Sequence, residues 1–257
     1  MEQVNADRSP GRVPSGAVLV GIVAVYLVIV GVIHAVATSS LGELDYGRFP
    51  DVETIVRAVV IPVGSSIVFC VAVIGWLGWW TPVRGGDAPV ERWVRVVPAV
   101  LLAAIVLGTD YATLADQGVG FTLVLLVAGL MIGLGEELMF RGIVIVALRR
   151  QGRVEGRVAL VSSVVFGLAH AVNFFLDGGG NLGQIVVTGF MGWFLYVTRR
   201  SFGSVFVPAA LHGLWDFGLF SGLVTTDVYG GAALFVLAEL GVAILLIVRR
   251  RRIEITS

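Results

Sequence analysis

Long apolar stretches separated by short polar segments run through almost the whole of this 257-residue chain. A helix needs roughly 20 predominantly apolar residues to cross a bilayer. The stretches near that length are residues 17–37, 56–80, 94–113, 121–148, 157–176, 183–198, 203–220 and 230–248. The pattern therefore predicts an all-α fold, a polytopic transmembrane helical bundle of about eight spans. Glycines and Pro208 interrupt the sixth and seventh stretches, so seven spans is the alternative.

The 18 basic residues are all arginines, and most lie in every second segment between the predicted spans. These segments hold Arg8 and Arg12, then Arg84, Arg92 and Arg95, then Arg149, Arg150, Arg153 and Arg157, then Arg199 and Arg200, and finally Arg249 to Arg252. Only Arg48 and Arg57 lie in an outer segment, where four acidic residues offset them. Basic loops stay in the cytoplasm, so we expect a multi-pass protein of the cell membrane with both termini cytoplasmic. An even number of spans follows, which favours eight.

The composition agrees with this setting, because 57% of residues are hydrophobic, 14% are charged and the mean hydropathy is +0.93. These values exclude an ordinary soluble domain of this length. We expect residues 1–15 to form a disordered cytoplasmic tail and residues 16–250 to form a single transmembrane domain. The first apolar stretch is too long for a cleavable signal peptide, so we expect it to be retained. The single cysteine, Cys70, excludes an intrachain disulfide.

Three charged residues, Glu136, Glu137 and Arg141, interrupt the apolar stretch 121–148. Each charge at membrane depth costs at least about 2.5 to 3.5 kcal/mol, so such residues usually have a function. Glu137 and Arg141 are four residues apart and share a helix face, where the arginine can neutralise the carboxylate. A buried ion pair that only fixes helix packing is the alternative, but it leaves Glu136 unexplained.

Two further pairs at helical spacing follow. In the fifth stretch, Phe166 precedes His170 by one turn, and in the seventh, His212 precedes Asp216 by one turn, so each pair shares a face. The alternatives are a packed histidine in the first case and a local hydrogen bond between His212 and Asp216 in the second. His34 in the first stretch has no charged neighbour at helical spacing, and we interpret it as structural.

The depths of these polar residues coincide. Glu136 lies 13 residues before Arg149, His170 lies 13 after Arg157, and His212 lies 12 after Arg200. At about 1.5 Å of rise per residue, each is roughly 18 to 20 Å from the arginine-rich end of its helix. The sequence therefore predicts that these groups meet in one polar site.

Three motifs carry a family resemblance: Glu136-Glu137-x-x-x-Arg141, Phe166-x-x-x-His170 and His212-x-x-x-Asp216. In this order they resemble the signature motifs of the CAAX-protease and bacteriocin-processing family of intramembrane endopeptidases. The resemblance covers about residues 121–220 and implies a catalytic core there. Asp216 stands where the eukaryotic prenyl-protein proteases have asparagine, which weakens any implication that the substrate is prenylated.

The resemblance also implies roles. Glu136 with His170 is expected to orient and deprotonate a water molecule, while His212 and Asp216 hold the oxyanion. Because a carboxylate cannot donate a hydrogen bond, the more natural role of Asp216 is to fix the tautomer of His212. Arg141 is expected to orient Glu137.

The cofactor is left open between none and zinc. Glu136, His170 and His212 are suitable zinc ligands, but we favour the mechanism without metal because Asp216 has the spacing needed to orient His212. The expected partners are membrane lipids and a membrane-associated protein or peptide substrate, with no nucleic acid.

Two other functions compete with the protease interpretation. Intramembrane acids also serve proton-coupled transporters, and Glu239 with Asp110 would fit such a chain, although the hydropathy pattern shows no inverted repeat. The second is a non-catalytic binding or immunity-type membrane protein of the same fold, against which the complete motifs argue.

Overall fold

A computed structural model describes residues 11–42, 44, 47–85, 89–173, 182–224 and 231–254. In this part of the chain the regular structure is helical apart from two isolated β-bridges, Gly85–Ser204 and Val90–Glu254. The predicted all-α fold is confirmed for these residues. Residues 1–10 of the predicted disordered tail lie outside them, as do residues 174–176 of the fifth predicted span.

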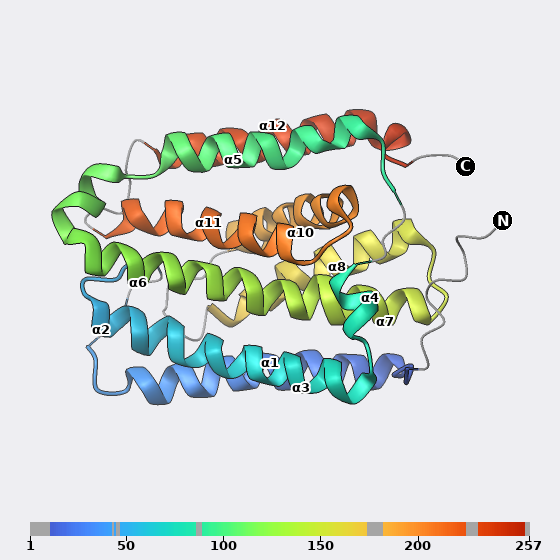
Figure 1. The fold of residues 1–257 in the computed structure, drawn as a ribbon, viewed down its shortest axis with the longest axis horizontal. Coiled ribbons are helices and arrows are strands. Elements are labelled where there is room, and N and C mark those ends of the chain that lie inside the picture. Colours follow the sequence, from blue (N-terminus) through green and yellow to red (C-terminus); the bar gives the residue numbers. More distant parts are fainter. Residues whose placement is uncertain are drawn as a thin grey trace.

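The long helices lie side by side with their axes along one common direction (Figure 1). In chain order the elements are α1 (Gly16–Thr38), α2 (Val52–Ile55), η2 (Val56–Val60), α3 (Ile61–Leu77), α4 (Trp80–Arg84), η3 (Arg92–Arg95), α5 (Val96–Gly108), α6 (Tyr111–Glu137), η4 (Leu138–Val144), α7 (Ile145–Arg150), α8 (Glu155–Ala169), η5 (His170–Val172), α10 (Leu182–Phe202), α11 (Phe206–Leu223), α12 (Ala232–Arg249) and η6 (Arg250–Arg252). Helices α5 and α12 pack together on one face, α1 and α3 on the opposite face, and α6 packs on α11 between them.

Five helices in the described ranges are long and apolar enough to cross a membrane. They are Gly16–Thr38, Val52–Leu77, Tyr111–Arg150, Glu155–Val172 and Ala232–Arg252. Each corresponds to a predicted span, although the helix from Tyr111 begins ten residues before the predicted start at residue 121. The total of eight spans and the membrane orientation stay predictions.

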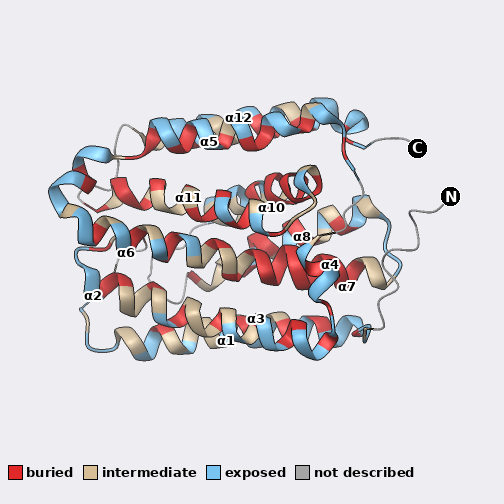
Figure 2. Cartoon of the chain, viewed as in Figure 1, coloured by how far each residue is buried: buried red, intermediate tan, exposed pale blue. Residues whose placement is uncertain are grey.

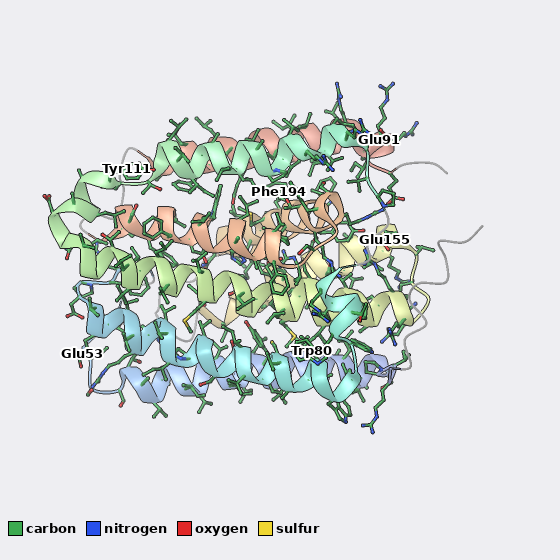
Figure 3. The ribbon with its side chains drawn as sticks, in the orientation of Figure 1. Glu53, Trp80, Glu91, Tyr111, Glu155 and Phe194 are labelled. Atoms are coloured by element: carbon green, nitrogen blue, oxygen red, sulfur yellow. The ribbon has the colours of Figure 1, made fainter. Side chains whose placement is uncertain are left out.

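The arginine-rich segments meet at one end of the bundle, where α1 begins and α12 ends (Figure 1). There the Arg150 guanidinium lies 5.2 Å from the Trp79 ring centre, and Arg249 lies 5.4 Å from that of Trp93. Figure 3 places Glu155 at this end and Glu53 at the other. Tryptophan is enriched at membrane interfaces, so these contacts agree with the prediction that the basic segments share one side.

Helices α6 and α11 approach so closely that only glycine fits between their backbones. A Cβ atom added to Gly133 would lie 2.2 Å from the Ala209 carbonyl oxygen, and one added to Gly213 would lie 2.6 Å from that of Gly129. Small residues of this kind let membrane helices pack backbone to backbone. The close approach brings the end of α6, with Glu136, next to α11.

We expect Gly133→Ala to lower the free energy of unfolding by about 1 to 3 kcal/mol, because the methyl group must push α6 away from α11. Thermal unfolding in detergent measures the change. Gly21→Ala is the matched control, because a Cβ atom at this position in α1 meets nothing within 4 Å. Equal unfolding midpoints for the two variants would contradict the packing argument.

Candidate active site

Four helical segments bring the predicted site residues together inside the bundle. Glu136 and Glu137 end α6, Arg141 lies in the π-helical segment η4, His170 begins η5, and His212 and Asp216 lie one turn apart in α11. Every residue from Glu137 to Leu148 is buried, and Figure 2 shows this buried segment between α6 and α7. Short π-helical segments are frequent at functional sites.

The predicted pair of Glu137 and Arg141 is present and fully buried. The Arg141 Nη1 atom lies 2.8 Å from the Glu137 Oε1 atom, and both residues have 0% exposure. Arg141 Nη2 also donates to the Gly192 carbonyl oxygen at 3.0 Å, and the guanidinium lies 4.0 Å from the Phe166 ring centre. These contacts from α8 and α10 hold Arg141, and through it the Glu137 carboxylate, in one position.

Glu137 lies within hydrogen-bond distance of His212, a contact that the sequence did not predict. The His212 Nδ1 atom lies 3.2 Å from the same Glu137 Oε1 atom that Arg141 binds. Asp216 Oδ2 lies 3.6 Å from His212 Nε2, which is too long for a hydrogen bond. The close packing of α6 on α11 places Glu137 beside Nδ1, while Asp216 faces Nε2 on the other side of the ring.

Both ring nitrogens of His212 therefore face carboxylate oxygens. Nδ1 faces Glu137, while Nε2 lies 3.6 Å from Asp216 and 3.9 Å from Glu136 Oε2. Carboxylates accept hydrogen bonds and do not donate them when ionised, whereas an imidazolium donates from both nitrogens. The surroundings thus suit His212 as a hydrogen-bond donor toward the space between Glu136 and Asp216.

The Nε2 atom of His170 faces the carboxylate of Glu136. Its Nδ1 atom lies 2.9 Å from the Phe166 carbonyl oxygen. A carbonyl only accepts, so Nδ1 carries the proton and Nε2 of the neutral ring is an acceptor. Nε2 lies 3.9 Å from Glu136 Oε2, too long for a direct hydrogen bond but suited to a bridging water.

Phe166 is a further site residue whose ring joins the two histidines. Its ring centre lies 4.9 Å from that of His170 and 5.8 Å from that of His212, both edge to face. The signal in the sequence was its spacing of one turn from His170. Phe166 thus fixes the planes of both imidazoles and at the same time covers Arg141.

The site opens into a cavity of about 380 Å³. Four of the predicted residues line it, namely Glu136, His170, His212 and Asp216, whereas Glu137 and Arg141 lie behind it. The cavity wall also includes residues that the sequence analysis did not place in the site: Tyr26, His34 and Glu239. The first two are eight residues apart in α1, a helical spacing that puts both on one face and could have indicated it.

His34 has a structural contact, in agreement with its interpretation from sequence. Its Nδ1 atom lies 3.0 Å from the Ala58 carbonyl oxygen in η2. Pro62, four residues later, has no N–H to donate to this carbonyl, as a helical residue normally would. The histidine therefore gives the Ala58 carbonyl a partner and connects α1 to η2.

The placement of the candidate zinc ligands does not fit the ion. Glu136 Oε2 lies 3.9 Å from both His170 Nε2 and His212 Nε2. Tetrahedral zinc with bonds of about 2.0 to 2.1 Å brings such donors to about 3.3 Å from one another. Among the described residues, no three His, Cys, Asp or Glu side chains form a group that could hold a metal ion.

Comparison with known proteins agrees with this geometry. Residues 118–218 match a family model described as type II CAAX prenyl endopeptidase, Rce1-like. The matched segment contains all six predicted site residues. Searches among curated proteins and among solved structures give no significant match. Over residues 118–218, this chain therefore resembles the CAAX-type endopeptidases, in agreement with the resemblance of its motifs.

Proposed function

We propose that the protein is an intramembrane endopeptidase that hydrolyses a peptide bond of a membrane-associated protein or peptide through a water activated by Glu136 and His170. The observation that carries the proposal is the position of Glu136 Oε2, which faces His170 and His212 at 3.9 Å each within one cavity. Peptide hydrolysis needs a base, a donor for the oxyanion and a proton for the leaving amine. These residues can supply all three.

Water activation follows from two acceptors that face each other. Glu136 Oε2 is buried and has no hydrogen-bond partner among the described residues, and His170 Nε2 is also an acceptor. A water molecule that donates one hydrogen to each atom directs its lone pairs away from both. Its oxygen then bonds to the scissile carbonyl carbon as a proton moves to Glu136.

His212 has the position needed for the next step. The Nε2–H group that its surroundings favour can donate to the carbonyl oxygen as negative charge develops there. The C–N bond then breaks, and Glu136 returns its proton to the leaving nitrogen. Glu137 and Arg141 act through His212 and are positioning residues, while Asp216 faces the same Nε2 atom from the cavity wall.

The direct test is cleavage of a peptide library by the protein purified in detergent, with the products identified by mass. Defined cleavage sites are the expected result, and intact peptides under all conditions would favour a non-catalytic protein of the same fold.

The transporter alternative loses one of its two supporting residues. Asp110 caps the start of α6, where its carboxylate accepts hydrogen bonds from the Thr113 N–H at 3.0 Å and from the Thr113 hydroxyl at 2.9 Å. It is not among the described residues that line the cavity. Glu239 does line the cavity, but without Asp110 the predicted proton chain is interrupted.

A metal-independent mechanism makes a further prediction. We expect chelators to leave cleavage unchanged and the purified protein to contain far less than one zinc per chain, because the candidate ligands are too far apart for the ion. Elemental analysis and cleavage assays of the His170→Ala and His212→Ala variants check this, with His34→Ala as the matched histidine control. One zinc per chain, lost in the first two variants and kept in the third, would replace this mechanism with a metal-dependent one.

A further inference from the structure

Glu239 is an acidic residue in α12 that faces the catalytic cavity. The preceding turn of α12 carries Phe235, whose ring centre lies 4.7 Å from that of Trp215 in α11. Residues one turn apart share a helix face, so Glu239 lies on the α12 face directed toward α11. It lines the same cavity as Glu136 and His212.

The depth of Glu239 matches that of the proposed active site. It lies 10 residues before Arg249, which corresponds to roughly 15 Å from the arginine-rich end of its helix. Helices α11 and α12 run in opposite directions (Figure 1). From the contact between Trp215 and Phe235, one turn toward the arginine-rich end therefore leads to Glu239 on α12 and to the level of His212 on α11.

The carboxylate of Glu239 has no partner among the described residues. No hydrogen bond or ion pair joins it to any residue that the structure describes, whereas Glu136 and Asp216 face imidazoles. Arg48, the one arginine in the described cavity wall, has an interaction of its own. An acid at membrane depth without a partner is costly and indicates a function, and the hydrolytic steps above do not use this one.

We propose that Glu239 is a specificity-determining residue that binds a basic side chain of the substrate near the scissile bond. The inference rests on the proposed endopeptidase function and adds the charge of the substrate to it. A lysine or arginine in the bound peptide gives Glu239 a cationic partner, which it does not have among the described residues. Hydrolysis itself takes place at Glu136 and His170, so Glu239 selects among peptides without taking part in bond breaking.

The test measures cleavage of peptides that differ at one position only. A peptide cleaved by the purified protein is resynthesised with Lys, Met or Glu at each position within about six residues of the cleaved bond, a span of roughly 20 Å on either side in extended form. At one position, the unmodified protein is expected to cleave the Lys peptide about ten to a hundred times faster than the Met peptide, the effect of one hydrogen bond to a charged group.

Variants of Glu239 then test whether this residue causes the preference for Lys. Glu239→Gln should remove the preference for Lys while cleavage of the Met peptide persists, and Glu239→Asp should retain part of it. Glu239→Lys should instead prefer the Glu peptide. Glu91→Gln is the matched control, because Glu91 is exposed at the arginine-rich end, outside the cavity wall (Figure 3).

The outcomes separate the two proposals. A protein that cleaves no peptide would overturn the endopeptidase function and this inference with it. Cleavage without a preference for Lys at any position, or a preference that Glu239→Gln retains in full, would overturn only the role of Glu239. Circular dichroism of each variant shows that a lost preference is not a loss of fold.

Discussion

Replacing Glu136 by glutamine is expected to slow peptide cleavage by about a hundred- to ten-thousandfold, the usual contribution of a general base. Glutamine keeps the size of the side chain but cannot accept a proton from the water. The Oε2 atom that is lost has no hydrogen-bond partner among the described residues, so the substitution breaks no bond seen in the fold. Rates of product formation from a cleaved peptide measure the effect.

Two comparisons make the Glu136 result specific. His170→Ala should give a loss of similar size, because the water then has one acceptor instead of two. Glu91→Gln removes a carboxylate from the exposed surface and should retain full activity. Near-normal turnover by Glu136→Gln, at normal helical content, would contradict the role of Glu136 as the base.

The sequence predicted those features of the fold that depend on single helices, namely their positions and the all-α class. The apolar stretches located the helices and the all-α class, because helix formation in a membrane depends on local hydrophobicity. The boundary between the third and fourth stretches was wrong. The sequence suggested a helix through residue 113, but α5 ends at Gly108 and Asp110 caps α6 by accepting from the Thr113 N–H. The carboxylate of Asp110, which caps α6, sets this boundary within an otherwise apolar stretch.

The sequence predicted how deep in the membrane the site residues lie, but not which of their side chains contact each other. Helical rise fixes how far Glu136, His170 and His212 lie from the arginine-rich end, and the structure brings them together. Which side chain meets which depends on how closely two helices pack. The glycine contact between α6 and α11 put Glu137 against His212, and spacing along one helix had suggested Asp216 instead. The catalytic roles of these residues remain predictions for the experiments above.

The residues of the cavity wall could be identified only from the tertiary structure. Tyr26 and His34 come from α1, more than 100 residues before the motifs, and Glu239 comes from α12. Neither helix carries a motif of the family, and the family match ends at residue 218. The helices outside the matched segment therefore complete the cavity.

Replacing Arg141 by alanine is expected to lower the free energy of unfolding by about 3 to 5 kcal/mol and to abolish cleavage. The substitution leaves the Glu137 carboxylate buried without its counter-ion, and breaking a buried pair on one side is strongly destabilising. The same change removes a hydrogen bond to the Gly192 carbonyl and the contact with the Phe166 ring. Reversible unfolding in mixed detergent micelles measures the loss.

The matched control is Arg153→Ala, because Arg153 is exposed and its substitution should change the free energy of unfolding by no more than about 0.5 kcal/mol.

The double variant Arg141→Met with Glu137→Gln separates the effect of the charge from that of the packing. It removes both ions together, so it should be more stable than Arg141→Ala alone. It should still be inactive, since His212 loses the carboxylate that holds its Nδ1 atom. A double variant less stable than the single one would show that the packing of Arg141, and not the stranded charge of Glu137, dominates the loss.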